Sequence, residues 1–302
     1  MKADQLEAMI KGILTVESAK DIITAAFPRF RGMQVELLDE GWDFQVFEVD
    51  AGWLFRFPKR EECATKLSME CRLLPDLADW VSLPIPRHVY CAELHESLDR
   101  PFARYKKLPG IAGDVSKSVD QHRVARQLGL FLTELHAYPV DKAREAGVPE
   151  RSDIVAHWRN KCREQLNRIV DLNVDPSNLR RYLENDVPLS FEGASRLVHN
   201  DLWAEHILVD PRSGNVSGII DWGDAAISDP AVDFAGLYAW YGEKWLENVL
   251  AYYSRTPDTE IISRSRYLAT CLAIHNITLG QDLGRPQWIK AGQEALRLIF
   301  AA

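Results

Sequence analysis

Residues 197–210 of the chain read LVHNDLWAEHILVD, and residues 219–224 read IIDWGD. In both stretches, polar side chains follow short apolar runs that are typical of buried strands. A turn at residues 213–215 separates the runs, so we expect a hairpin that delivers Asp201 and Asp221 to one edge. Burying either carboxylate without a partner would cost free energy. The pattern therefore indicates a site that faces a metal, a base or a substrate.

Phosphoryl transfer is the chemistry that this spacing matches. It needs a carboxylate that orients the attacking hydroxyl and accepts its proton, a metal ligand shortly afterwards, and an Asp for Mg²⁺ on the next strand. Asp201, His206 and Asp221 occupy these three places, and His199 would be a structural residue that opens the loop. The metal would neutralise the charge of the moving phosphoryl group.

Working outward, the residues before this stretch are β-rich after an initial helical pattern. Two β-rich runs surround a turn at Gly52 and predict a hairpin within residues 35–57. A helix is expected from Glu61, broken at or soon after Pro75. Further strands are expected at residues 89–91 and 102–105.

After Pro109-Gly110, apolar residues recur mainly at helical spacing. Helices are expected at residues 119–136, 154–172, 179–183 and from Phe234 onward, around a small β-rich insert at 197–220. The order predicts an α+β architecture of two lobes. The N-terminal lobe would cover residues 1–106, a hinge would lie at about 104–110, and the helical lobe would cover 107–302.

Composition excludes several classes of protein. The 302 residues carry a formal net charge of −8, which argues against binding to nucleic acid. No apolar run is long enough for a membrane span, and the N-terminus lacks the apolar core of a signal peptide. The five cysteines show no Cys-x-x-Cys spacing, so we expect free thiols and a cytoplasmic protein.

The combination His199-x-Asp201-x4-His206 with residues 220–224 resembles the aminoglycoside and macrolide phosphotransferases, kinase-like enzymes that inactivate antibiotics. The resemblance covers nearly the whole chain and is closest to enzymes that phosphorylate the 2″-hydroxyl of aminoglycosides. It implies a protein-kinase-like fold with a β-rich N-lobe and a mainly helical C-lobe. Asp201 would be the catalytic base. His206 and Asp221 would bind Mg²⁺, and GTP or ATP would be the phosphoryl donor.

The resemblance also implies a nucleotide site in the N-terminal lobe. The strand cation that contacts phosphate would be Arg56, where the family has Lys, with Lys59 as a second candidate. Glu70 would pair with that cation, and Gly41 lies in the segment expected to be the phosphate loop. Residues 105–108 would be the hinge whose backbone pairs with the base; they include Tyr105, Lys106 and Lys107. If Tyr105 lies behind the base, it would favour guanine over adenine, but the choice between GTP and ATP stays open.

Acceptor recognition is expected from acidic residues near Asp201, because aminoglycosides are polycations whose ammonium groups need carboxylate partners. The candidates are Asp224, Glu205, Asp229 and Glu243, with Trp240 stacking on a sugar face. The protein would be a monomer that acts on a small-molecule antibiotic.

Other interpretations stay open at this point. The acceptor could be a macrolide, phosphorylated at its 2′-hydroxyl, or a housekeeping metabolite, because small-molecule kinases share these catalytic parts. A metal-dependent hydrolase lacks further His ligands, and Arg56 is the one feature that suggests an inactive nucleotide-binding module. As purely structural assignments, Asp233 would cap the helix that starts at Phe234, and His136 would end the preceding long helix.

Overall fold

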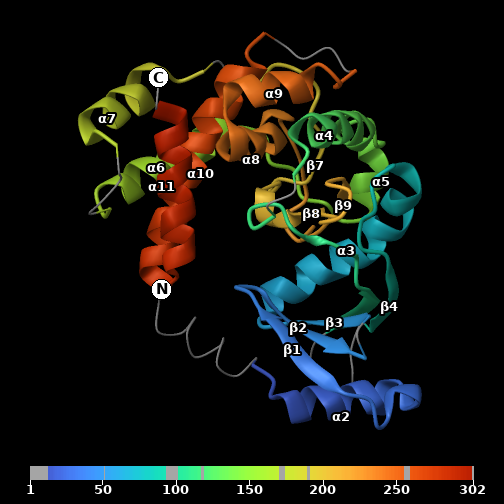
Figure 1. The fold of residues 1–302 in the computed structure, drawn as a ribbon. Coiled ribbons are helices and arrows are strands. Elements are labelled where there is room, and N and C mark those ends of the chain that lie inside the picture. Colours follow the sequence, from blue (N-terminus) through green and yellow to red (C-terminus); the bar gives the residue numbers. More distant parts are fainter. Residues whose placement is uncertain are drawn as a thin grey trace. The chain divides into compact units, whose positions relative to one another are not determined.

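The computed structural model describes residues 13–50, 52–92, 101–116, 119–169, 174–188, 191–254 and 259–300. The chain divides into two compact units, one formed by residues up to Trp80 with Pro84–Pro109 and the other by Val81–Leu83 with Gly110–Ala302. Unit 1 is built on an antiparallel sheet and unit 2 is mainly helical (Figure 1). The α+β fold class predicted from the sequence is confirmed.

Unit 1 contains a five-stranded sheet with the order β1-β2-β3-β5-β4. Its strands are β1 Val35–Glu40, β2 Phe44–Val49, β3 Trp53–Pro58, β4 His88–Ala92 and β5 Phe102–Lys106. Each neighbouring pair is antiparallel. The predicted hairpin is β2–β3, in which Phe47 pairs with Phe55 and Val46 with Arg56. Strand β1 was not foreseen as a separate element.

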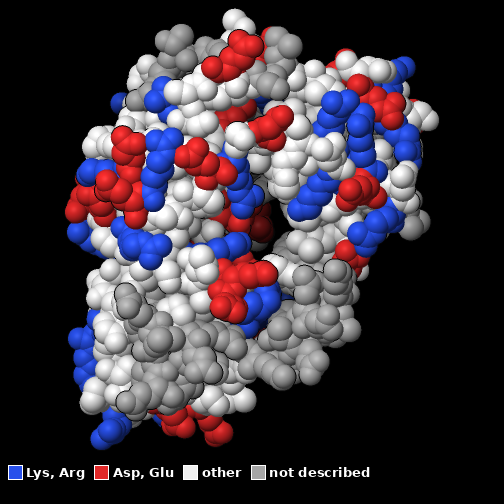
Figure 2. Space-filling view, turned by 180° about the vertical axis from the view of Figure 1, so that it is seen from behind, with Lys and Arg blue, Asp and Glu red and all other residues white. Residues whose placement is uncertain are grey.

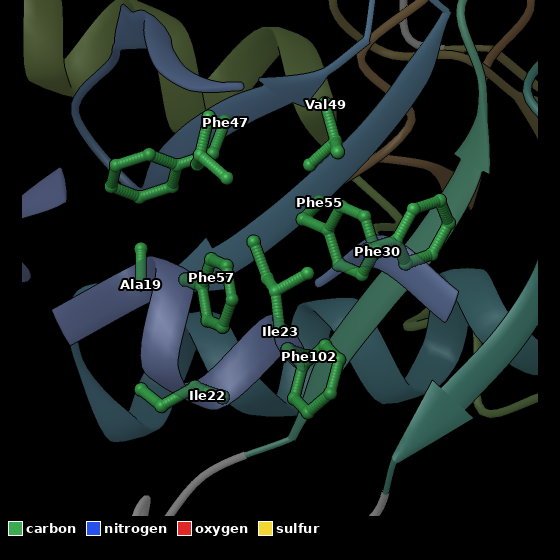
Figure 3. Close-up of a cluster of buried hydrophobic side chains, with 10 residues drawn as sticks. Ala19, Ile22, Ile23, Phe30, Phe47, Val49, Phe55, Phe57 and Phe102 are labelled. Carbon is green, nitrogen blue, oxygen red and sulfur yellow. The ribbon is translucent and has the colours of Figure 1, made fainter. Parts of the chain in front are cut away.

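Helices cover both faces of this sheet, because its strands alternate side chains between the two faces. On one face, α2 (Val16–Ala26) and η1 (Pro28–Phe30) pack against a buried cluster that includes Phe47, Phe55 and Phe57 (Figure 3). On the other face, α3 (Glu61–Trp80) packs with Leu67 against Phe44. Arg56, between Phe55 and Phe57, therefore points to the α3 side.

Two expectations for unit 1 are corrected. Helix α3 continues past Pro75 to Trp80, because packing of the helix against the sheet outweighs the local breaking tendency of proline. The cysteines are not all free: Cys71 of α3 and Cys91 of β4 form a disulfide. The two residues are 20 positions apart in sequence, and only the fold brings them together.

Unit 2 holds the remaining helices and two small sheets. The helices are α4 Gln121–Leu135, α5 Val140–Glu145, α6 Ile154–Leu166, α7 Pro176–Asn185, α8 Ala231–Tyr241, α9 Glu243–Leu250, α10 Ile261–Leu283 and α11 Pro286–Phe300, with the short η2 Ala204–His206. The strands are β6 Ile111–Ala112, β7 Arg196–Val198, β8 Ile207–Val209, β9 Val216–Ile219 and β10 Ala226–Ser228. The β insert was expected as one group, but β7 pairs with β10, whereas β8 pairs with β6 and β9.

Local sequence explains where several of these helices begin. Asp120 accepts a hydrogen bond from the backbone N–H of Arg123 (3.1 Å) at the start of α4, and Asp153 accepts one from Ala156 (3.1 Å) at the start of α6. Helix α10 lies in the middle of the helical layer and packs against α6, α8 and α11. Its buried face gives unit 2 a large apolar core.

The initial helical pattern of the sequence covers the first 30 residues: α2 forms its later part, and the part before residue 13 lies outside the described residues. In the part of the chain that the structure describes, no helix is both long and apolar enough to cross a membrane.

Candidate active site

The loop between β7 and β8 carries the polar residues of the sequence motif. His206, at the end of η2, lies among three carboxylates: its Nδ1 is 3.5 Å from Asp201 Oδ2, and its Nε2 is 3.7 Å from Asp221 Oδ2 and 3.8 Å from Glu205 Oε1. Nδ1 also lies 2.7 Å from the backbone oxygen of Asp201 and donates to it. The structure thus brings the carboxylates of three residues together around the imidazole ring of His206.

Two residues of the site have an unusual backbone. Asn200 has φ 64° and Asp221 has φ 65°, the left-handed region that L side chains rarely adopt. Such conformations cost free energy and persist only where surrounding contacts enforce them. Asn200 is held by a hydrogen bond from its Nδ2 to the backbone oxygen of Asp224 (3.0 Å).

His199 anchors the beginning of the loop. Its Nε2 donates to the backbone oxygen of Ile220 (2.9 Å), while its Nδ1 accepts the backbone N–H of Asp201 (3.3 Å). The ring is fully buried against Trp222, with centroids 4.5 Å apart, and burial lowers its pKa to about 4. A neutral His199 therefore connects the segment of Asp201 to the segment of Asp221.

Asp233 fixes the same loop from α8. Its buried carboxylate accepts the backbone N–H groups of His199 (3.0 Å) and Asn200 (2.8 Å) and lies 3.1 Å from His136 Nε2. The other ring nitrogen of His136 lies 2.9 Å from the hydroxyl of Tyr253. The sequence interpretation of Asp233 as a helix cap is wrong, because α8 already begins at Ala231. His136 does stand at the end of α4, where it serves this buried network.

The charges of the site shift the pKa values of its central residues. Burial and the carboxylates of Asp224, Asp221 and Glu205 raise the pKa of Asp201 to about 7, although His206 opposes them. Burial would lower the pKa of His206, but the carboxylates outweigh it and raise that pKa to about 9. Burial is the largest cause of the shift at Asp201, and the carboxylates around the imidazole contribute to both shifts.

The predicted acceptor residues divide into two groups. Glu205 is half-exposed beside His206, and Asp224 lies close enough to Asp201 to influence its pKa. Asp229 is buried instead and binds Arg264 of α10 through Nε (2.6 Å) and Nη2 (3.2 Å). Its carboxylate therefore links the turn before α8 to α10 and is not available to an acceptor.

Glu243 and Trp240 stand at the junction of α8 and α9. Glu243 accepts a hydrogen bond from the Tyr238 hydroxyl (2.8 Å). The ring of Trp240 stacks on Tyr241 and lies against Gly113, whose N–H donates to the backbone oxygen of Ala204 (3.0 Å). Trp240 is thus near the β7–β8 loop, whereas Glu243 is bonded within its own helix pair.

A lysine of α6, Lys161, which contacts His275 of α10, was missed by sequence reasoning. Lys161 Nζ lies 3.3 Å from His275 Nε2 and 4.5 Å from the centre of the Trp158 ring. Burial and Arg151 lower the pKa of Lys161, whereas Asp224 raises it. The acidic group around Asp201 therefore has a basic neighbour, and no local motif marks it because the residues come from two helices.

In unit 1, Arg56 and Glu70 form a buried ion pair. Arg56 Nη1 donates to both Glu70 carboxylate oxygens (3.0 and 2.7 Å), and the guanidinium lies 3.7 Å from the centre of the Phe44 ring. The pair predicted from the sequence is therefore formed in the structure. His88 is close by, 3.7 Å from Glu70, and its ring lies 5.0 Å from that of Tyr105.

The other predicted nucleotide residues occupy two further places in unit 1. Lys59 is buried and donates to the backbone oxygen of Gly41 (2.8 Å). Lys106 lies 3.9 Å from the centre of the Trp53 ring, and Lys107 donates to Glu48 (2.7 Å). Lys59 is thus directed at the β1–β2 loop, and Lys106 and Lys107 at the β2–β3 hairpin.

The donor set fits a metal that is held partly by its substrate. Among the described residues, no group of three His, Cys, Asp or Glu side chains forms a metal site. Mg²⁺ is usually bound by one or two carboxylates together with substrate phosphates and water. Asp221, with its carboxylate 46% exposed, suits that mode of binding.

Comparison with known proteins points to one chemistry. The model of the phosphotransferase enzyme family matches residues 34–263. The solved GDP and kanamycin complex of APH(2″)-IIIa is 31% identical, with 94% of this chain and 98% of that chain covered and a TM-score of 0.75. A macrolide 2′-phosphotransferase type I is 23% identical, with 95% and 98% covered and a TM-score of 0.66, which shows a shared fold. Viomycin phosphotransferase of Streptomyces vinaceus is 30% identical over 157 residues, 50% of this chain and 54% of the relative.

Proposed function

Because the chain belongs to the phosphotransferase enzyme family, we propose that it transfers the γ-phosphoryl group of GTP or ATP to a hydroxyl of an antibiotic, an aminoglycoside in the first place. The observation that carries the proposal is the convergence of Asp201, His206 and Asp221 at the β7–β8 loop. The kanamycin and GDP complex of a structural neighbour supports the acceptor and donor classes.

Asp201 acts as the catalytic base. Its carboxylate orients the acceptor hydroxyl and accepts its proton as the oxygen attacks the γ-phosphorus, while the bond from that phosphorus to the β,γ-bridging oxygen breaks and GDP or ADP leaves. The raised pKa, about 7, suits a group that must take up a proton near neutral pH. Asp233 and His199 hold the loop so that this oxygen is presented in one position.

Mg²⁺ would neutralise the charge of the transferred phosphoryl group. Asp221 would hold it with a carboxylate oxygen. His206 would support it through Nε2, since Nδ1 already donates its proton to the backbone oxygen of Asp201. The His206 ring must then lose a proton, because only a neutral imidazole can be a ligand.

Unit 1 supplies nucleotide binding. Arg56 contacts phosphate from the α3 face, and Glu70 holds its guanidinium in place. Gly41 brings the β1–β2 loop close to the phosphates. Tyr105, Lys106 and Lys107 belong to the hinge at about residues 104–110, whose backbone pairs with the base.

Acceptor binding uses the acidic residues next to Asp201 and His206. Glu205 and Asp224 bind ammonium groups, and Trp240 provides an aromatic face for a sugar ring. The neighbouring Lys161 would disfavour an ammonium group on the part of the acceptor that faces α6. A macrolide, with one amine and a large apolar surface, is the second candidate because a macrolide phosphotransferase shares the fold. A housekeeping metabolite is the third.

The protein would work as a cytoplasmic monomer without a nucleic-acid or membrane partner. Figure 2 shows Lys and Arg side chains interspersed with Asp and Glu over the face in view, and the net charge of the chain is −8. A surface of this kind gives a polyanion little to bind.

The experiment is incubation of the purified chain with Mg²⁺, GTP or ATP, and a panel of aminoglycosides and macrolides. Mass spectrometry then measures the gain of about 80 Da that one phosphoryl group adds to the acceptor. Omission of the nucleotide is the matched control. We expect the gain on an aminoglycoside.

A gain on macrolides alone would keep the reaction and change the acceptor. Absence of any gain, with nucleotide still bound, would contradict antibiotic phosphorylation and direct the search to other metabolites.

A further inference from the structure

The loop between β1 and β2, residues 41–43, does not owe its shape to glycine. Gly41 has no positive φ. A Cβ at this position would meet Asp39 Oδ2 at 3.6 Å and the backbone oxygen of Phe44 at 3.8 Å, both ordinary contacts. The freedom that glycine gives a backbone is therefore not what fixes the loop, and side chains of neighbouring segments must do so.

Lys59, just after β3, provides the first anchor. Its ammonium donates to Glu40 Oε1 (3.0 Å) and to the backbone oxygen of Gly41 (2.8 Å). Its backbone N–H donates to the backbone oxygen of Asp43 (2.9 Å). Lys59 is only 4% exposed, whereas the side chain of Glu40 is 39% exposed. Lys59 thus holds both ends of the loop.

Asp43 provides the second anchor, directed at α3. Its Oδ1 accepts from Arg60 Nη2 (2.5 Å) and from Cys63 Sγ (3.3 Å), and its Oδ2 accepts from Lys66 Nζ (2.7 Å). Burial alone would raise the pKa of Asp43, but Lys66 and Arg60 outweigh it and lower that pKa. An ionised Asp43 therefore ties the end of the loop to the start of α3.

Arg60 joins the two halves of the arrangement. Its Nη1 donates to the backbone oxygen of Trp42 (3.0 Å), and its guanidinium lies 4.9 Å from the centre of the Trp42 ring. All the bonds from Lys59, Arg60, Cys63 and Lys66 described above end on oxygen atoms. They fix the loop without engaging its backbone N–H groups, which are the groups that an anion-binding loop offers to phosphate.

Resting on the nucleotide-dependent function proposed above, we propose that Asp43 is a positioning residue for the nucleotide donor: through Arg60 and Lys66 it holds the β1–β2 loop ready for the phosphates. In this arrangement Lys59, Arg60 and Lys66 are anchors of the loop and not phosphate ligands. The contact with phosphate is left to the loop backbone and to Arg56.

The test uses the full chain with the substitution Asp43→Asn. Steady-state kinetics should show a KM for the nucleotide about tenfold higher, while kcat and the KM for the acceptor change less than twofold. Asp43→Glu, which keeps the charge, should recover most of the nucleotide KM. The matched control is Asp79→Asn, because Asp79 also pairs with an arginine of unit 1, Arg87 (2.7 and 3.0 Å), away from the loop. It should leave every constant unchanged.

Lys66→Met is the second variant and decides the matter if Asp43→Asn does not fold. Lys66 is 32% exposed, so its loss should leave the fold intact and raise the nucleotide KM about threefold. An unchanged nucleotide KM in the folded variants would overturn the inference. If the unaltered chain binds neither GDP nor ADP by calorimetry, the proposed function fails and this inference falls with it. If it binds them and the variants bind equally well, the inference alone fails.

Discussion

The carboxylate of Asp233 accepts the backbone N–H of Asn200 at 2.8 Å, a hydrogen bond that joins residues 33 positions apart. Its other oxygen accepts the N–H of His199 at 3.0 Å, one position earlier. Two consecutive N–H groups are thus bound immediately before Asp201. This contact holds the β7–β8 loop by its backbone, so the position of the Asp201 carboxylate depends on a residue of α8.

Replacing Asp233 by Asn should therefore impair both stability and turnover. The amide can accept through one oxygen only, which leaves a buried N–H group unpaired at a cost of about 1–3 kcal/mol in the free energy of unfolding. We expect kcat to fall at least about tenfold, with the nucleotide KM little changed, because unit 1 is unaffected. Urea unfolding and steady-state kinetics measure the two effects. The control is Asp282→Asn, since Asp282 pairs with Arg168 (2.6 Å) where both side chains are exposed.

Gly236 explains how closely α8 approaches the same loop. A Cβ at this position would lie 2.1 Å from the backbone oxygen of Leu202 and 2.8 Å from its carbonyl carbon. Gly236→Ala should displace the loop, and we expect kcat to fall about 100-fold, the cost of misplacing reacting groups by about 1 Å. Gly52→Ala is the control, because a Cβ there meets its nearest atom at 3.8 Å. Equal activity of the two variants would show that the loop is not held by this contact.

Much of this site could be predicted from the sequence, because the motif residues are close together along the chain. Asp201 lies after β7, His206 lies just before β8, and Asp221 lies after β9, so their closeness needs only the local geometry of short strands and turns. The pairing of Arg56 with Glu70 was expected from the resemblance to a known family, not from local geometry. The fold class followed from the same periodicities.

Long-range partners could not be predicted in this way. The sequence around Asp233 does not show whether its carboxylate caps a helix or accepts hydrogen bonds from backbone N–H groups 33 and 34 positions earlier. Asp229 is a carboxylate, the kind of side chain expected to bind the ammonium groups of an aminoglycoside. In the structure it binds Arg264 of α10 instead, a residue 35 positions away. Lys59 could reach phosphate or the loop, and only the folded hairpin directs it to Gly41. These partners are decided by tertiary packing.

The disulfide between Cys71 and Cys91, which the sequence did not predict, can be tested directly by counting free thiols. In denaturant without reductant, thiol titration should count the three free cysteines, Cys63, Cys162 and Cys271. After reduction the count should rise to five, the number in the sequence. Closing a loop of 20 residues should add about 3 kcal/mol to the free energy of unfolding. A count of five without reductant would contradict the bond.

His88 should make the protein less stable in mild acid. Burial and the charge of Arg56 lower its pKa from 6.5 to about 3. Below pH 6.5 the unfolded chain binds a proton that the folded chain does not bind until about pH 3, so stability falls as the pH drops through this window. Between pH 7 and pH 5 the free energy of unfolding of the unaltered chain should fall by about 2 kcal/mol more than that of the variant His88→Phe. This variant keeps an aromatic ring beside Tyr105. Urea unfolding at both pH values provides the comparison, and equal losses would contradict the assignment.

The proposed function requires Asp201 to be the base of a phosphoryl transfer. The most direct measurement is the single-turnover rate of transfer to the acceptor by Asp201→Asn, with nucleotide affinity measured on the same sample. Asn cannot accept the hydroxyl proton, so we predict a rate at least about 100-fold lower than that of the unaltered chain, at unchanged nucleotide affinity. A variant that transfers phosphate at the unaltered rate would contradict the account.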